Sequence, residues 1–259
     1  MQRFLPVAVK NSGVSLEELL PDALAEKPSL PAFELISKLY RQIAVGSFLM
    51  SGNPQDLAEH LFNSSRAFAH FCDVAPAGAK LTSRAEAFFD AVACRDDEGA
   101  RRIAAGSPST PDPSREYEED FYKVRFAMDL WSQAPRDSLE RMLAAWTALA
   151  ADPDPYAELY RAMLERDQKA FEEAVAKVIE AKQEHYEYLR AKERLDADEG
   201  ATLPHVSTEL LALLELAERS GLKPAREYPM APGLARKMGK PRFPPPDAWR
   251  VAEGWSELG

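Results

Sequence analysis

The sequence predicts an all-α protein, a single domain of about eight to ten helices packed as antiparallel hairpins, with a proline-rich C-terminal tail. Three observations predict this fold class. Apolar residues recur at helical spacing along most of the chain. No segment alternates apolar and polar residues between turn signals, which is the pattern of a strand. The 20 prolines, against 12 glycines, stand mainly at the boundaries of the expected helices.

Helix signals are frequent in the first half of the chain. Ser15–Glu18 has the form of a capping box, which indicates a helix start. Pro31–Met50 carries an apolar stripe that ends before a glycine, and Asn53 followed by proline predicts a new helix reaching about Cys72. A second capping box, Ser83–Glu86, is expected to open a helix through the apolar residues that follow. A short helix is expected over Asp97–Ala105.

The second half shows the same periodicity. From Tyr117 to Trp131, large apolar residues follow one another at intervals of four, three, four and three positions, which predicts one apolar helix face. A second such face is expected over Leu139–Leu149. After a proline hinge, a helix from Tyr156 to Leu164 is followed by a long helix that Asp167 caps. We expect a polar loop over residues 197–204, and then a leucine-rich helix over residues 207–220.

The chain is expected to divide into an all-helical domain, residues 1–236, and a C-terminal tail, residues 237–259. Phe243 precedes three prolines, which favour the polyproline II conformation. Asp247 is expected to cap a last short helix that bears Trp249 and Trp255. Two large aromatic side chains in a tail predict that it docks on the helical domain.

Composition and charge narrow the function. Hydrophobic residues make up 46% of the 259 residues and charged residues 29%, which excludes a mainly disordered chain. There are 32 Lys and Arg against 42 Asp and Glu, a net charge of −10. This argues against nucleic acid as the main partner, because phosphate contacts need clustered cations. No signal peptide or membrane span is recognisable, so a cytoplasmic location and no membrane contact are expected. Cys72 and Cys94 are expected to be buried free thiols.

No motif for catalysis or ligand binding is present. The sequence lacks HExxH, GxSxG, P-loop, GxGxxG and CxxC patterns, and its four histidines do not have the spacing of metal ligands. We therefore expect no cofactor, no metal and no enzyme activity. A surplus of acid can instead complement a basic protein partner, such as a nuclease, and speed its association.

An acidic group at the start of the Tyr117–Trp131 segment is our candidate for contact with such a partner. It consists of Glu116, Glu118, Glu119 and Asp120. Negative charge at a helix start also complements the helix dipole, so the group has a purely structural explanation as well. A protein interface should place such acids beside exposed aromatic side chains, because a few anchor residues dominate binding.

Several segments between Ala85 and Tyr188 occur in an order and spacing typical of one family. The first is a helix that ends in Phe88–Asp96, followed by Glu116–Glu118 and the helix ending at Trp131. The last is Leu159–Leu164, followed by Asp167, Phe171 and a helix that reaches His185 and Tyr188. In these segments the chain resembles the immunity protein 49 family of bacterial polymorphic toxin systems, over about 140 residues if the leucine-rich helix is included.

The resemblance implies an all-helical immunity protein, or antitoxin, without a cofactor, which binds and neutralises a cognate toxin in competition between bacteria. The positions that carry the resemblance are expected to be structural. Arg95 would pair with a carboxylate, Asp96 and Asp167 would cap helices, and Phe171 would be a core residue. The remaining motif positions are Cys94, at the same turn as Arg95, and His185 and Tyr188, at the end of the long helix, for which a structural role and toxin contact both stay open.

Two other functions stay open from the sequence. The segment from Asp154 to Val178 resembles one tetratricopeptide repeat, so a helical-repeat scaffold or adaptor is the main alternative, although no 34-residue period is found. The second alternative is an enzyme whose catalytic residues come together only in the folded chain. A deep polar pocket with carboxyls of raised pKa, or a bound metal, would indicate it.

Overall fold

The structure is a computed structural model that describes residues 4–25, 27–149, 152–237 and 239–257. These residues contain no strand, only an isolated β-bridge between Tyr228 and Ala231, so the all-α prediction is confirmed. They form three short 3-10 helices and twelve α-helices, which are α1 (Leu5–Ala25), α2 (Leu30–Ser51), α3 (Pro54–Val74), α4 (Ala87–Cys94), α5 (Asp97–Gly106), α6 (Glu118–Trp131), α7 (Arg136–Thr147), α8 (Pro155–Glu165), α9 (Gln168–Ala191), α10 (Ala197–Thr202), α11 (Thr208–Arg219) and α12 (Gly233–Arg236).

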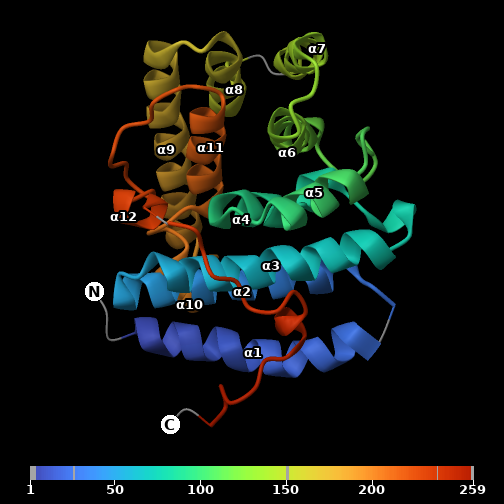
Figure 1. Ribbon diagram of the computed structural model, residues 1–259, viewed down its shortest axis with the longest axis vertical. Coiled ribbons are helices and arrows are strands. Elements are labelled where there is room, and N and C mark those ends of the chain that lie inside the picture. Colours follow the sequence, from blue (N-terminus) through green and yellow to red (C-terminus); the bar gives the residue numbers. More distant parts are fainter. Residues whose placement is uncertain (1–3, 26, 150–151, 238, 258–259) are drawn as a thin grey trace.

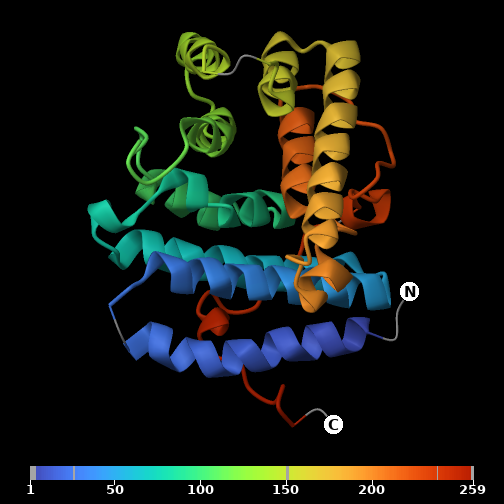
Figure 2. The ribbon, with the colours of Figure 1, turned by 180° about the vertical axis from the view of Figure 1, so that it is seen from behind.

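The helices form two groups that cross each other (Figure 1). In the first group α1, α2 and α3 lie side by side, and α4 and α5 pack on α3. In the second group α8, α9 and α11 stand across the first, while α6 and α7 are seen end-on beside them. The view from behind shows α9 reaching down to α2 (Figure 2). One face of α4 packs on α3 and another on α11, so this short helix joins the two groups.

Side-chain caps fix several helix starts, and two of them, Asn53 and Asp167, were predicted from the sequence. Asn53 accepts a hydrogen bond from the N–H of Gln55 at the start of α3, and Asp154 caps α8, where Pro155 occupies the first turn. Asp167 and Ser207 cap α9 and α11 in the same way. The side-chain oxygen satisfies an N–H group that has no partner within the helix, which is why these residues terminate the preceding loops.

Both predicted capping boxes are wrong. α1 already begins at Leu5 and continues past Ser15, because an apolar face from Leu5 to Leu20 stays buried along its whole length. At the second site the chain makes a 3-10 turn at Thr82–Arg84, and α4 begins only at Ala87 without a side-chain cap. In α1, tertiary packing therefore overrides the local capping pattern.

Other sequence expectations also need correction. Tyr117 precedes α6 and is 79% exposed, so it does not belong to the buried stripe of that helix. Leu149 follows the end of α7 and is also exposed. The segment expected as a polar loop after residue 197 contains α10, whose start is capped by Asp196. Asp247 does not cap a helix through its side chain, and only a 3-10 turn follows it.

The C-terminal segment runs back over the first group of helices (Figure 1). Phe243 stacks on Phe62 of α3 with ring centroids 4.4 Å apart, and Trp249 is 2% exposed. The hydroxyl of Tyr40 donates a hydrogen bond of 2.7 Å to the carbonyl of Trp249. Farther on, the Trp255 ring lies against the backbone of Gly13 in α1. The division of the chain at residue 237 into domain and tail stays a prediction.

The contact between Gly13 and Trp255 gives a test of how the C-terminal segment is held. An added Cβ at Gly13 would lie 2.1 Å from the indole, so Gly13→Leu should displace this ring. We expect a loss of about 1–3 kcal/mol in the free energy of unfolding, a red shift of tryptophan emission and faster proteolysis of the segment. Gly78→Leu is the control, since a Cβ there meets no atom within 4 Å. Equal behaviour of the two variants would contradict the packing described.

Candidate functional site

A charged cleft of about 780 Å³ lies where the two groups of helices meet. Its walls come from α2, α4, α6, α9, α10 and α11, so the site exists only in the folded chain. The volume lies in the range of ordinary ligand and loop-binding sites. Besides apolar side chains such as Leu35, the charged residues that line it are Glu34, Lys38, Arg41, Arg84, Glu86, Asp120, Lys123, Lys182, Glu199 and Glu209.

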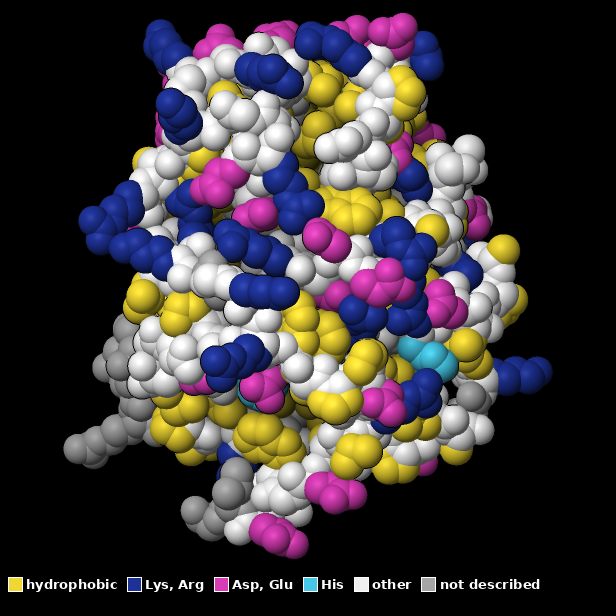
Figure 3. Space-filling view, viewed as in Figure 1, with side chains coloured by type: hydrophobic (Ala, Val, Ile, Leu, Met, Phe, Trp, Pro, Cys, Tyr) yellow, Lys and Arg dark blue, Asp and Glu magenta, His cyan; other side chains and the backbone are white. Residues whose placement is uncertain are grey.

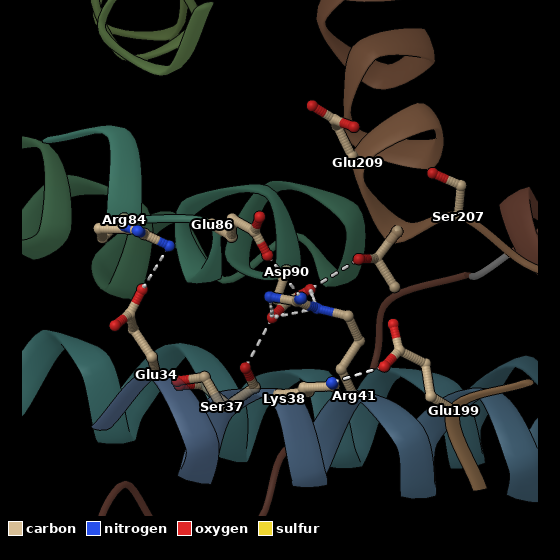
Figure 4. A network of polar contacts seen from close by, with 12 residues as sticks. Glu34, Ser37, Lys38, Arg41, Arg84, Glu86, Asp90, Glu199, Ser207 and Glu209 are labelled. Atoms are coloured by element: carbon tan, nitrogen blue, oxygen red, sulfur yellow. Dashed lines mark hydrogen bonds and ion pairs between the residues drawn. The ribbon is translucent and has the colours of Figure 1, made fainter. Parts of the chain in front are cut away.

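The base of the cleft is built on the buried carboxylate of Asp90 in α4, which is fully inaccessible to solvent. Arg41 of α2 donates to both carboxylate oxygens, with Nε 2.8 Å from Oδ1 and Nη2 2.9 Å from Oδ2 (Figure 4). Two hydroxyls complete the shell, that of Ser64 at 2.6 Å and that of Thr208 at 2.8 Å. Four helices, α2, α3, α4 and α11, thus meet at one carboxylate.

Glu209 of α11 forms a second centre of charge in the cleft. The ammonium groups of Lys123 and Lys182 both pair with its carboxylate, and the Tyr156 hydroxyl donates to it at 3.1 Å. Burial by itself would raise the pKa of Glu209, but the two lysines and these hydrogen bonds lower it well below its usual range. Glu209 is therefore held ionised, and it ties α11 to α6 and α9.

The remaining charges form ion pairs near the rim (Figure 4). Lys38 pairs with Glu199 at 2.6 Å, and Arg84 with Glu34 at 3.7 Å. The carboxylate of Glu86 accepts from Arg41 at 3.0 Å, although its side chain is 63% exposed. Each cation that lines the cleft thus has a carboxylate partner.

The four predicted contact acids do not act as one group. Glu116 is half-buried and accepts from the backbone N–H groups of Ser83 and Asp112, so it organises a loop. Glu118 and Glu119 stand in the first turn of α6, the latter fully on the surface. Asp120 is also exposed but turns to the cleft, where it lies within electrostatic range of Lys123. Tyr117, between Glu116 and Glu118 in the sequence, is 79% exposed.

Cys94 and Arg95 lie at the end of α4. Cys94 is fully buried, and burial raises the pKa of its thiol well above the usual value. Arg95 ends the helix in the left-handed conformation, with a φ of 63°. Its guanidinium pairs with Glu215 of α11 at 3.2 Å, which adds a second link between these two helices.

Asp96 forms another buried ion pair. Its carboxylate accepts from Arg66 of α3 at 2.6 Å and from the Ser65 hydroxyl at 2.7 Å. It also accepts from the N–H of Gly99 and thereby caps α5. Only 2% of the Asp96 side chain is exposed, so this carboxylate cannot meet a partner directly.

The motif positions on α9 have different surroundings. Asp167 caps the helix and Phe171 is fully buried. His185 lines the cleft beside Tyr186, whereas Tyr188, three residues after His185, is 52% exposed and lies under the ammonium of Lys192. Of the contact acids and family-motif positions predicted from the sequence, His185 and Asp120 line the cleft.

Most residues of the cleft were not indicated as a site by the sequence, among them Arg41, Tyr186 and Glu209 in its lining and Asp90 at its base. One signal was present, since Asp90 is a lone acid within an apolar run, Phe88 to Cys94, and such an acid needs buried donors. The donors that surround Asp90 could not be identified in the same way, because Arg41 and Thr208 lie 49 and 118 residues away from it along the chain.

The face seen in Figure 3 carries many Lys and Arg side chains. Lys and Arg side chains gather there over α11, α12 and the chain around them. Residues 219–250 contain eight Lys and Arg against two Asp and Glu, so the acidic surplus belongs to the rest of the chain. In the described part of the chain no helix is both long and apolar enough to cross a membrane. The same residues hold no group of three His, Cys, Asp or Glu side chains suited to a metal ion.

Fold and site together define a helical protein with a charged, polar cleft at the junction of two helix groups. A family model for Immunity protein 49 matches residues 38–234, which is most of the chain. The chain therefore belongs to the immunity protein 49 family, and the resemblance seen in the sequence is confirmed. No curated protein and no solved structure matches it.

The buried pair of Asp90 and Arg41 should dominate the stability of the site. Asp90→Ala leaves a nearly buried guanidinium without its main partner, and we expect a loss of about 3–5 kcal/mol in the free energy of unfolding, measured by urea denaturation. Glu86→Gln removes the exposed partner of the same guanidinium and should cost less than about 1 kcal/mol. Similar losses for both variants would show that burial does not set the strength of this pair.

Proposed function

We propose that this chain is an immunity protein that binds and neutralises a cognate bacterial toxin by stoichiometric protein–protein inhibition in the cytoplasm. Membership of the immunity protein 49 family carries the proposal. We assign the contact surface to the start of α6 and the adjoining cleft. In support, Tyr117 is the most exposed of the large hydrophobic side chains on the described surface, and it stands among acids as an interface anchor would.

The scaffold alternative receives less support from the fold. Repeat proteins stack similar helix pairs, and each pair contacts mainly its neighbours. Here the α-helices range from 4 to 24 residues, and the two groups cross instead of continuing one superhelix. The pair α8 and α9 packs as a hairpin, but no second hairpin of the same proportions follows it in the described residues.

The enzyme alternative meets one of its conditions, because burial raises the pKa of Glu34 in the cleft, against the opposing charge of Arg84. The nearby hydroxyls, however, already serve the fold. Ser207 caps α11, and the Ser37 hydroxyl donates to the backbone carbonyl of Ser64. A hydrolytic site needs a nucleophile beside a base, and these contacts leave the serines in other roles. Binding without catalysis is therefore the function we propose.

Co-expression with the product of the neighbouring gene tests the proposal. If that product is toxic, the full chain should restore growth and form a complex of fixed stoichiometry in size-exclusion chromatography with light scattering. Persistent toxicity in the presence of a folded chain would exclude the proposed inhibition.

Charge reversal tests the location of the surface. The triple variant Glu118→Lys, Glu119→Lys and Asp120→Lys should slow association with the toxin about tenfold at low salt and weaken its salt dependence, since steering depends on local charge. Glu116 is left unchanged because its carboxylate holds a loop.

The matched control reverses three exposed acids on the first helix group, Glu18, Asp22 and Glu59, to Lys. The net charge changes equally, but these positions lie on α1 and α3. Surface plasmon resonance at several salt concentrations compares the two variants. Equal slowing by both would assign the effect to net charge and not to the start of α6.

A further inference from the structure

The charges of the cleft do not balance. Together with Asp90 at its base, the cleft holds six carboxylates, while its lining provides five cations, all from Lys and Arg. Every one of these cations is already paired with a carboxylate. An anion entering the cleft would have to break one of these ion pairs. A single added positive charge would balance the site.

One carboxylate in the cleft is available for that charge. Among the described residues, Asp120 is the only acid lining the cleft that has neither an ion pair nor a hydrogen bond. Glu86, which is 63% exposed, faces the same space and uses one of its oxygens for Arg41. Both acids lie within electrostatic range of Lys123, which places them around one region of the cleft.

Neutral groups in the cleft fit a long basic side chain. Burial raises the pKa of Tyr186 to about 12, and its hydroxyl has no hydrogen-bond partner in the described structure, so it remains a neutral group free to accept or donate. Leu35 is 45% exposed at the wall of the cleft, next to Pro31. Arg and Lys side chains bury an apolar stem and expose a charged end, which matches this combination of surfaces.

We propose that the cleft receives a basic side chain, Arg or Lys, from a loop of the partner protein, with its charge bound by Asp120 and its stem along Leu35. The inference rests on the proposed function, in which the partner is the toxin. Tyr117 precedes Asp120 by three residues, so a partner seated on the Tyr117 ring would be in position to insert the side chain. The cleft volume of about 780 Å³ leaves room for the loop that carries it.

The first test uses a small probe and does not depend on the toxin. N-acetyl-L-argininamide is titrated into the full chain labelled with ¹⁵N, and N-acetyl-L-citrullinamide, which has nearly the same shape without the charge, is the matched probe. We expect saturable shifts of amide signals around Asp120, Leu35 and Tyr186 for the charged probe only. Asp120→Asn should abolish them, whereas Glu119→Gln should not. Equal shifts for both probes, or none in the cleft, would overturn the cation site.

The second test uses the cognate toxin. Asp120→Asn should weaken its binding on the order of 10- to 100-fold, mainly through faster dissociation, while Glu119→Gln should change it less than about threefold. Thermal melting of both variants shows whether they fold as the natural chain does, and we expect only a small change, because Asp120 has no ion pair or hydrogen bond to lose and both variants remove one charge from the first turn of α6.

The two tests separate this inference from the proposed function. If the toxin binds the natural chain and Asp120→Asn with equal affinity, the cation site is wrong and the immunity function stands. If the charged probe binds in the cleft but no neighbouring toxin does, the cation site stands and the immunity function is wrong.

Discussion

The structure depends most on the buried carboxylate of Asp90. A carboxylate without solvent is costly unless donors surround it, and here a guanidinium and two hydroxyls from three other helices do so. The two helix groups can meet in only one way if α2, α3 and α11 are all to reach α4. Asp96 repeats the principle six residues further along the chain, with Arg66 and the cap of α5, within the first group. The contacts of Asp90 with Arg41 and Thr208 fix where α11 of the second group meets the first.

The cleft follows from the same constraint. Arg41 points from α2 to Asp90 at the base (Figure 4). Glu209 on α11 pairs with Lys123 on α6 and Lys182 on α9. The Asp90 centre holds α11 to α2, the Glu209 centre holds α11 to α6 and α9, and the cleft is lined by residues of all four helices. Their cations are fully engaged, so the charge that remains is negative and lies at the start of α6. A rigid polar wall with a free acid and an exposed tyrosine at its edge is well suited to hold a basic protein surface.

Sequence reasoning succeeded where structure is decided locally. The apolar stripes, the caps at Asn53 and Asp167, and the prolines at helix starts all act within a few residues. It failed where packing overrides a local pattern, as in α1, whose buried face runs through the capping signal at Ser15. The cleft could not be predicted, because its pairs join residues such as Lys38 and Glu199, 161 positions apart. Asp90 stands out in the sequence as an isolated acid in an apolar run, but the sequence does not show which residues donate to it.

The central claim, that the partner occupies the cleft and the adjoining start of α6, is tested most directly by hydrogen–deuterium exchange of the full chain with and without its cognate toxin. The account predicts that protection on binding is concentrated in residues 117–123 of α6 and in the part of α9 around residues 181–186. The basic face over α11 and α12 should exchange as in the free protein. Protection confined to that face, or to α1 and the C-terminal segment, with unchanged exchange at the cleft, would contradict it.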